Sequence, residues 1–241
     1  MHKKTVFQQK RRGWFRFMKS LMTKRYPCPT FLFLGEHFRE GSLILSNHEG
    51  TDAPMSLELW CDVPIRMWGA HEMNSGLAEL YKYQTRIYYH EKKHWNLHLA
   101  RLFCLLASPL TYLFYKGLGL ISTYHDARFV KTLRESVAAV ESGESIVIFP
   151  EDSTNGYLDQ LEGFHAGFVS LCDALYRKGI DVPVYVTFFK KKECVYVVDR
   201  PVFYSELRAC ASSREEIAQR LLDRANALSR GEYVEQKVKI S

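Results

Sequence analysis

Two side chains that could share a proton stand four residues apart in the stretch 46–54, SNHEGTDAP. A histidine such as His48 can act as a general base, and a carboxylate one helical turn further on, here Asp52, can hold the imidazole ring in the useful tautomer. The stretch follows the apolar run 42–45 and Gly41, which could open that run as a strand. The pattern therefore places a candidate base and carboxylate where a strand gives way to a helix.

The same residues also fit an ordinary helix N-terminus. Asn47 or Thr51 could cap the helix, and the helix dipole favours Asp52 in the first turn. The stretch by itself leaves both interpretations open.

A second polar cluster follows the apolar strand expected over residues 146–149, in SIVIFPEDSTNGY. The strand runs directly into Pro150 and Glu151, and ligands of open α/β sheets bind at the carboxyl ends of the strands. The next residues supply neutral hydrogen-bonding groups, namely Ser153, Thr154 and Asn155. An ordinary turn has the same composition, so this cluster gains weight only in combination with the first.

Apolar runs and amphipathic segments alternate along the chain. Strands are expected over residues 30–34, 42–45, 65–70, 118–122, 146–149, 182–189 and 194–198. Helices are expected over residues 7–24, 54–60, 74–89, 97–115, 125–140, 165–178 and 214–228, and the helix over residues 97–115 is expected to be kinked or broken near Pro109. The alternation predicts one α/β domain whose mixed sheet is largely buried between flanking helices, preceded by an N-terminal amphipathic helix.

The positive charge of this 241-residue chain gathers near its N-terminus. Residues 1–35 carry nine Lys or Arg and no acid, whereas the remaining 24 basic and 27 acidic residues give a net charge of −3. The segment 7–24 sets Trp, Phe, Met and Leu against Lys and Arg at helical spacing, which is typical of a helix in an anionic membrane interface. A helix packed on the domain fits too. A nucleic-acid arm has no other support in the chain.

The cysteines and the apolar segments indicate the cellular compartment in which the chain is expected. Six scattered cysteines with no C-x-x-C pair suit reduced thiols. We expect no secretory signal, since an uncharged apolar region before a cleavage site is lacking. The uncharged run 102–115 is too short to span a bilayer, and predicts a buried, re-entrant or interfacial helix.

Together, NHEGTDAP after a strand and GESIVIFPEDSTNGY after an amphipathic helix resemble the glycerolipid acyltransferase family, the 1-acyl-glycerol-3-phosphate acyltransferases and their relatives. The family's first block is Asn-His-x4-Asp, and its third is Phe-Pro-Glu-Gly-Thr-Arg. The resemblance runs from about residue 31 to residue 201 and includes the order of the elements. Five residues match directly: Asn47, His48, Phe149, Pro150 and Glu151.

The resemblance implies roles for these residues. His48 would remove the proton from an acceptor hydroxyl or amine, which then attacks the thioester of an acyl carrier, while Asp52 supports the imidazolium. Glu151 would help to position the acceptor. The substrate-binding residues would be Asn47, Phe149, Pro150, Glu151, Ser153 and Thr154. The apolar segment 97–115 would house the acyl chain or contact lipid.

The sequence departs from the family pattern at several positions. The spacing is His-x3-Asp, one residue short, and Glu49 or a backbone adjustment could compensate. Asp152 replaces the family's glycine, and Asn155 stands near an expected arginine. In the second block, GLGLISTYHDAR, Tyr124 or His125 replaces an arginine and Arg128 comes late. Because guanidinium groups bind phosphate bidentately, we expect an acceptor other than glycerol phosphate or lysophosphatidate.

A different signal lies in residues 90–94, HEKKH, with His98 four further on. On a helix, His90 and His94 would share a face and could bind zinc, with Glu91 as general base of a metalloprotease. Two lysines inside the motif argue against a dication there. We therefore expect no metal.

The sequence as a whole predicts a membrane-contact helix over residues 1–27 and an acyltransferase-like domain over residues 28–241. The expected partners are a membrane lipid acceptor, the membrane surface and acyl-CoA or acyl carrier protein as co-substrate, with no further cofactor and no nucleic acid. The expected location is the cytoplasmic face of the membrane, as a peripheral or monotopic protein. The alternative is a catalytically silent relative that binds lipid or a partner.

Overall fold

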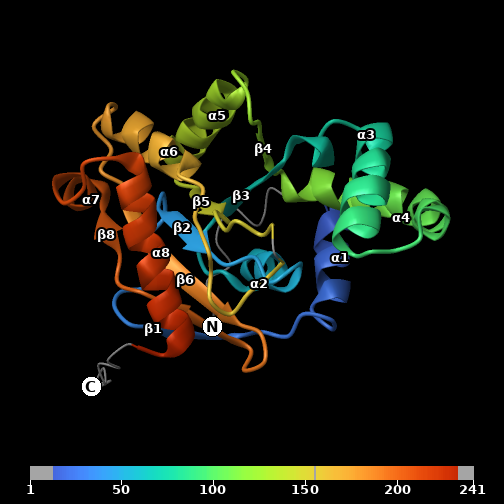
Figure 1. Cartoon of the computed structure of the whole chain (residues 1–241), viewed down its shortest axis with the longest axis horizontal. Coiled ribbons are helices and arrows are strands. Elements are labelled where there is room, and N and C mark those ends of the chain that lie inside the picture. Colours follow the sequence, from blue (N-terminus) through green and yellow to red (C-terminus); the bar gives the residue numbers. More distant parts are fainter. Residues whose placement is uncertain (1–12, 155, 233–241) are drawn as a thin grey trace.

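An eight-stranded mixed sheet forms the centre of the computed structural model, which describes residues 13–154 and 156–232 (Figure 1). The strand order is β1-β7-β6-β2-β5-β3-β4, and β8 pairs with β6. The strands are β1 (Thr30–Phe33), β2 (Leu43–Ser46), β3 (Ile65–Ala70), β4 (Ile121–Thr123), β5 (Ser145–Ile148), β6 (Pro183–Lys190), β7 (Val195–Val198) and β8 (Val202–Phe203). The expected α/β domain with a mixed sheet is confirmed.

Helices cover both faces of this sheet. They are α1 (Gly13–Met22), α2 (Asp52–Trp60), η2 (His71–Met73), α3 (Leu77–Lys82), η3 (Tyr83–Lys92), α4 (Leu97–Leu118), α5 (Phe129–Glu141), α6 (Gly167–Tyr176), α7 (Tyr204–Ala209) and α8 (Arg214–Arg230). The amphipathic helix expected over residues 7–24 is present as α1, and residues 7–12 lie outside the described part of the chain.

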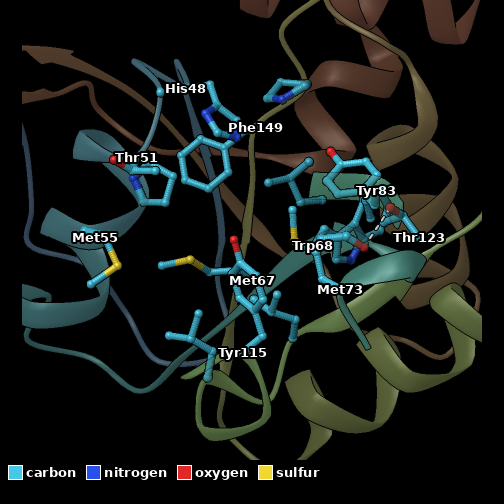
Figure 2. Close-up of a pocket in the computed structure, with 18 of the residues that line it drawn as sticks. His48, Thr51, Met55, Met67, Trp68, Met73, Tyr83, Tyr115, Thr123 and Phe149 are labelled. Carbon is cyan, nitrogen blue, oxygen red and sulfur yellow. Dashed lines mark hydrogen bonds between the residues drawn. The ribbon is translucent and has the colours of Figure 1, made fainter. Parts of the chain in front are cut away.

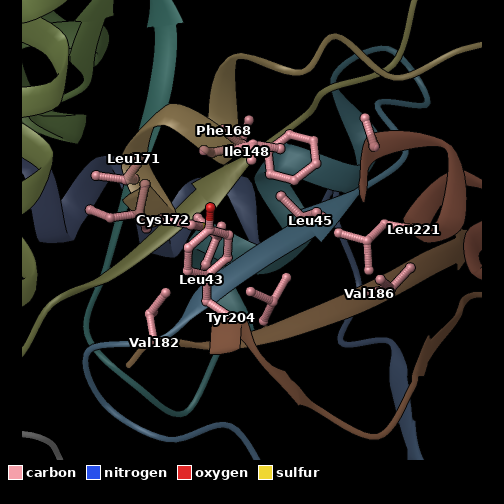
Figure 3. Packing of buried hydrophobic residues seen from close by; sticks show 14 of the residues in the cluster. Leu43, Leu45, Ile148, Phe168, Leu171, Cys172, Val182, Val186, Tyr204 and Leu221 are labelled. Carbon is pink, nitrogen blue, oxygen red and sulfur yellow. The ribbon is translucent and has the colours of Figure 1, made fainter. Parts of the chain in front are cut away.

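The strands at the centre of the sheet run parallel, and they are buried on both faces. β2 pairs in parallel with β5 on one side and with β6 on the other, and all four of its residues are buried. Successive side chains of a strand point to opposite faces. Leu43 and Leu45 therefore pack beneath α6 and α8 (Figure 3), whereas Ile44 joins the core on the other face.

The connection between β3 and β4 differs from the expected pair of α-helices. The helix expected over residues 74–89 is the short α3 followed by η3, a ten-residue π-helix that reaches Lys92. Helix α4 runs unbroken through Pro109 to Leu118, and Gly119 ends it in the left-handed conformation. The strand expected over residues 118–122 therefore starts only at Ile121. The short elements β8 and α7 had no distinct signal.

Helix α1 docks on the last turn of α4 through one aromatic ring. Phe15 is 1% exposed, and its ring lies against Phe114 with 5.7 Å between the centroids. A Cβ atom added at Gly117 would approach Cδ2 of Phe15 to 2.1 Å. Glycine is therefore required at position 117 for the two helices to meet.

We predict that Gly117→Ala destabilises the fold by about 1–3 kcal/mol, because overpacking forces the ring or the backbone to move. Denaturant unfolding measures the change. Gly13→Ala is the matched control, since an added Cβ there meets nothing within 4 Å. Equal unfolding midpoints for the two variants would contradict this packing.

Candidate active site

Parallel pairing of β2 and β5 brings the two polar motifs to one edge of the sheet. Leu45 is paired with Ile148, so the residues after each strand continue side by side. The segments 46–52 and 149–157 thus meet at the carboxyl end of the sheet, which is where ligands of such sheets bind.

A part-buried hydrogen bond links the two motifs. The backbone N–H of His48 donates to Oε2 of Glu151 at 2.7 Å, and the Glu151 side chain belongs to a residue only 7% exposed. The imidazole ring of His48 stacks on Tyr157 at 5.3 Å between centroids and lies 5.0 Å from the ring of Phe149. The candidate base is therefore held by three residues of the second motif.

Asn47 fixes the strand end from which His48 projects. Its side-chain amide donates to the carbonyl of Phe189 at 3.2 Å and accepts from the N–H of the same residue at 2.7 Å. Asn47 is 2% exposed. These two bonds continue the pairing of β2 with β6 by one residue, so the amide clamps the backbone beneath the site.

Asp52 lies in the first turn of α2, where the helix dipole favours a carboxylate. Among the described residues, its carboxylate forms ion pairs with Lys191, at 2.7 Å, and with Arg25, at 3.7 Å, and none with His48. Lys191 lies just beyond β6, and no feature of the sequence had singled it out.

A tight turn accommodates the short spacing between His48 and Asp52. Glu49 and Gly50 both have positive φ values, 40° and 65°. Burial raises the pKa of the Glu49 carboxyl. Thr51 precedes α2 but makes no capping bond, and its hydroxyl is 3.1 Å from the phenol oxygen of Tyr26. The backbone, not a capping side chain, sets the start of the helix.

The loop after Glu151 is shaped by its own polar groups. Oδ1 of Asp152 accepts from the hydroxyl and from the N–H of Thr154, at 2.6 and 3.1 Å, and these bonds lower the pKa of Asp152. Pro150 accepts a bond from the N–H of His165 at 2.8 Å, which draws His165 towards the loop. Asn155 lies outside the described residues.

An apolar cavity of 790 Å³ opens beside His48 (Figure 2). In Figure 2, His48 and Phe149 lie at one end, and Tyr115 lies at the opposite end. The wall is largely apolar and includes Met55, Met67, Met73, Phe114, Tyr115 and Leu118. A space of this size and polarity suits an acyl chain.

A second, more polar cavity of 640 Å³ lies on the other side of Tyr157. The loop after β5 contributes Glu151, Asp152, Ser153, Thr154 and Tyr157, and the end of η3 and the following turn contribute Tyr88, Glu91, Lys93 and His94. His165 lines both cavities. Burial raises the pKa of Tyr157 to about 12, so its phenol is uncharged at neutral pH. Of the stacked pair, His48 lines the apolar cavity and Tyr157 lines the polar one.

The HEKKH segment does not form the α-helical zinc motif. η3 ends at Lys92, and His94 has a φ of 55°, so the two histidines do not follow one helix. Nδ1 of His90 is 2.8 Å from the carbonyl oxygen of Trp95. In the part of the chain that the structure describes, no group of three or more His, Cys, Asp or Glu side chains is placed to hold a metal ion.

Comparison with known proteins gives similarity at the level of solved structures. No protein-family model matches the sequence, and no curated protein matches it. Among solved structures, the chain is similar to the 1-acyl-sn-glycerophosphate (LPA) acyltransferase PlsC from Thermotoga maritima, with a TM-score of 0.47 and 13% sequence identity. The match covers 95% of this chain and 80% of that one.

We predict that Asp52 and Lys191 are coupled in stability. In a double-mutant cycle of Asp52→Asn and Lys191→Met, the coupling should be roughly 0.2–1 kcal/mol, because half of the lysine side chain is exposed. Lys82→Met, which removes an unrelated surface pair, is the control partner. Purely additive effects would contradict the pairing. A fall in the pKa of His48 in Asp52→Asn, but not in Lys191→Met, would instead identify the carboxylate as the imidazole partner.

Proposed function

We propose that this protein is a membrane-associated acyltransferase that moves a fatty acyl group from an acyl thioester to a hydroxyl or amine of a lipid acceptor. One observation carries the proposal. A histidine whose backbone is held by a buried carboxylate lines an apolar cavity of acyl-chain size, and Tyr157, which stacks on its ring, lines a polar cavity that can receive a headgroup. Acyl transfer needs a base and these two cavities close together.

In the proposed reaction, His48 takes the proton of the acceptor hydroxyl or amine as that group attacks the thioester carbonyl. The tetrahedral intermediate collapses, the bond from carbonyl carbon to sulfur breaks, and the imidazolium returns the proton to the departing thiolate. The acyl chain occupies the apolar cavity. Glu151 acts as a positioning residue, since its carboxylate holds the backbone N–H of His48.

We assign Asp52 a positioning role in this reaction. Its ion pair with Lys191 fixes the start of α2, and thereby the turn of Glu49 and Gly50 that follows His48. Ser153 and Thr154 line the polar cavity and are proposed to donate hydrogen bonds to the acceptor, with Phe149 and Pro150 shaping the passage between the cavities.

We propose that the acceptor headgroup carries no phosphate monoester. The described lining of the polar cavity holds three carboxylates, those of Glu91, Glu151 and Asp152, against one lysine, Lys93, and no arginine. Arg128, the nearest arginine in the sequence to the family's second block, is bound to Asp126 at 2.8 Å and lies over the ring of Tyr124 at 4.5 Å. Carboxylates repel a dianion and suit hydroxyls or an ammonium group.

We propose that an acyl-CoA or acyl carrier protein donates the acyl group. We also propose that the protein acts at the cytoplasmic face of the membrane. Helix α1 supports membrane contact, because it carries the exposed Arg16, no acidic residue, and the exposed apolar side chains Phe17 and Leu21.

A second candidate is a catalytically silent lipid-binding relative. The observation that favours it is the pairing of Asp52 with Lys191, which leaves that carboxylate engaged elsewhere. In this case the two cavities would bind lipid without turning it over.

We predict that His48→Ala lowers acyl transfer by roughly 10²–10⁴-fold, the usual contribution of a general base. Release of free carrier thiol from an acyl thioester, with a panel of lipid acceptors, measures the rate. His37→Ala is the control, since this histidine is exposed and pairs with Asp62 on the surface. Equal thiol release by wild type and His48→Ala would favour the silent alternative.

We also predict that neutral or zwitterionic acceptors are acylated faster than lysophosphatidate. Competition between labelled lysophosphatidate, a monoacylglycerol and an N-acyl amino acid, with products identified by mass, tests the order. Asp152→Asn should raise the relative rate with lysophosphatidate, because it removes one repelling charge. Preference of the wild type for lysophosphatidate would overturn the proposed acceptor class.

A further inference from the structure

Helix α4 exposes an unusually apolar surface. Seven large apolar side chains point away from the protein, and Leu106 is 77% exposed. We call this surface the outer α4 face, and it consists of Leu99, Leu102, Phe103, Leu105, Leu106, Leu110 and Leu113. Figure 1 shows α3 and α4 projecting sideways from the sheet, so the described elements leave this face uncovered. Exposed apolar patches of this kind mark sites of interaction.

The opposite face of α4 is fully engaged. Ala100, Cys104 and Ser108 are buried, and the hydroxyl of Ser108 donates to the buried side chain of Gln84 at 2.8 Å. The amide of Gln84 in turn donates to Thr111 at 3.1 Å. The 22-residue helix contains an 18-residue stretch with a mean hydropathy of 1.5, so by length and composition alone it could cross a membrane. One side of the helix nevertheless packs against η3, so only the other side of α4 is open to a partner.

The charges around the outer α4 face point to one kind of partner. Helices α1 and α4 together carry the exposed Arg16, Arg101 and Lys116 and no acidic residue, whereas Lys19 is turned inward and pairs with Glu58. A second copy of this chain would bring these like charges together, whereas anionic lipid headgroups would neutralise them. At the start of α4, the rings of Tyr89, Trp95 and Phe103 pack within 5.5 Å of one another, as aromatic residues do at a membrane interface.

The engaged face of α4 also forms a wall of the apolar cavity. Thr111, Phe114, Tyr115 and Leu118 line it from the last two turns. A single helix therefore separates the outer α4 face from the cavity beside His48.

We propose that the outer α4 face enters one leaflet of an anionic bilayer, and that acyl chains pass from this leaflet around α4 into the apolar cavity. The membrane contact stands independently, while the passage of acyl chains rests on the proposed function. The contact is one-sided because η3 covers the other face, so α4 is embedded in the leaflet and does not span it.

Vesicle flotation of the full chain tests the membrane contact without any substrate. The probe is phosphatidylcholine vesicles with and without phosphatidylglycerol. The triple variant Leu102→Gln, Leu106→Gln, Leu110→Gln should lose more than about tenfold in partitioning, because burying leucine side chains in hydrocarbon is favourable and burying glutamine amides is not. Leu106→Gln alone should show a smaller loss. Val130→Gln is its matched control, because Val130 is 59% exposed on α5, away from this face.

The outcomes are distinct. Binding that is stronger with phosphatidylglycerol and lost in the triple variant supports the proposal. Unchanged binding of both leucine variants overturns it, and so does a wild-type dimer that becomes monomeric in the triple variant without any vesicle binding. Circular dichroism checks the fold, and the exposed single substitution keeps the test valid if the triple variant unfolds.

The passage of acyl chains has its own readout. With a water-soluble short-chain thioester, the triple variant should turn over like the wild type, while turnover of long-chain substrates in vesicles should fall. Equal losses with both substrates overturn the passage. If the wild type shows no turnover with either substrate, the proposed function fails, while flotation still decides the membrane contact.

Discussion

A part-buried hydrogen bond joins the two polar motifs of this protein, from the backbone N–H of His48 to the carboxylate of Glu151. The two residues are 103 positions apart in the chain, and the parallel pairing of β2 with β5 brings them together. A buried carboxylate is costly unless hydrogen bonds satisfy it, so the bond is both a requirement of burial and a constraint on the backbone of His48. The stacking of His48 on Tyr157 follows from the same junction.

The segment between β3 and β4 gives the site its surroundings. Its α4 helix walls the apolar cavity, and the end of η3 walls the polar one. The same segment carries the largest exposed apolar surface among the described residues. One insertion into an α/β sheet can therefore set the shape of both cavities and the orientation of the protein at a membrane.

Much of the fold could be predicted from the sequence because its signals are local. Apolar runs such as residues 146–149 predict buried strands, and amphipathic periods predict α5 and α8. The site was partly predictable for the same reason, since His48 and Glu151 each directly follow such a run. The π-helix η3 was not, because its residues also suit an α-helix.

The sequence by itself determined the α/β class, the ends of the central strands and the residue types that stand at those ends. The tertiary structure decided which of these residues meet. It paired Asp52 with Lys191 and Arg25, and it closed the polar cavity with Glu91 and Lys93. The physical reason is that hydrophobic periodicity is a property of neighbouring residues in the sequence. Ion pairs and cavity walls, in contrast, depend on strand order and on contacts between distant segments.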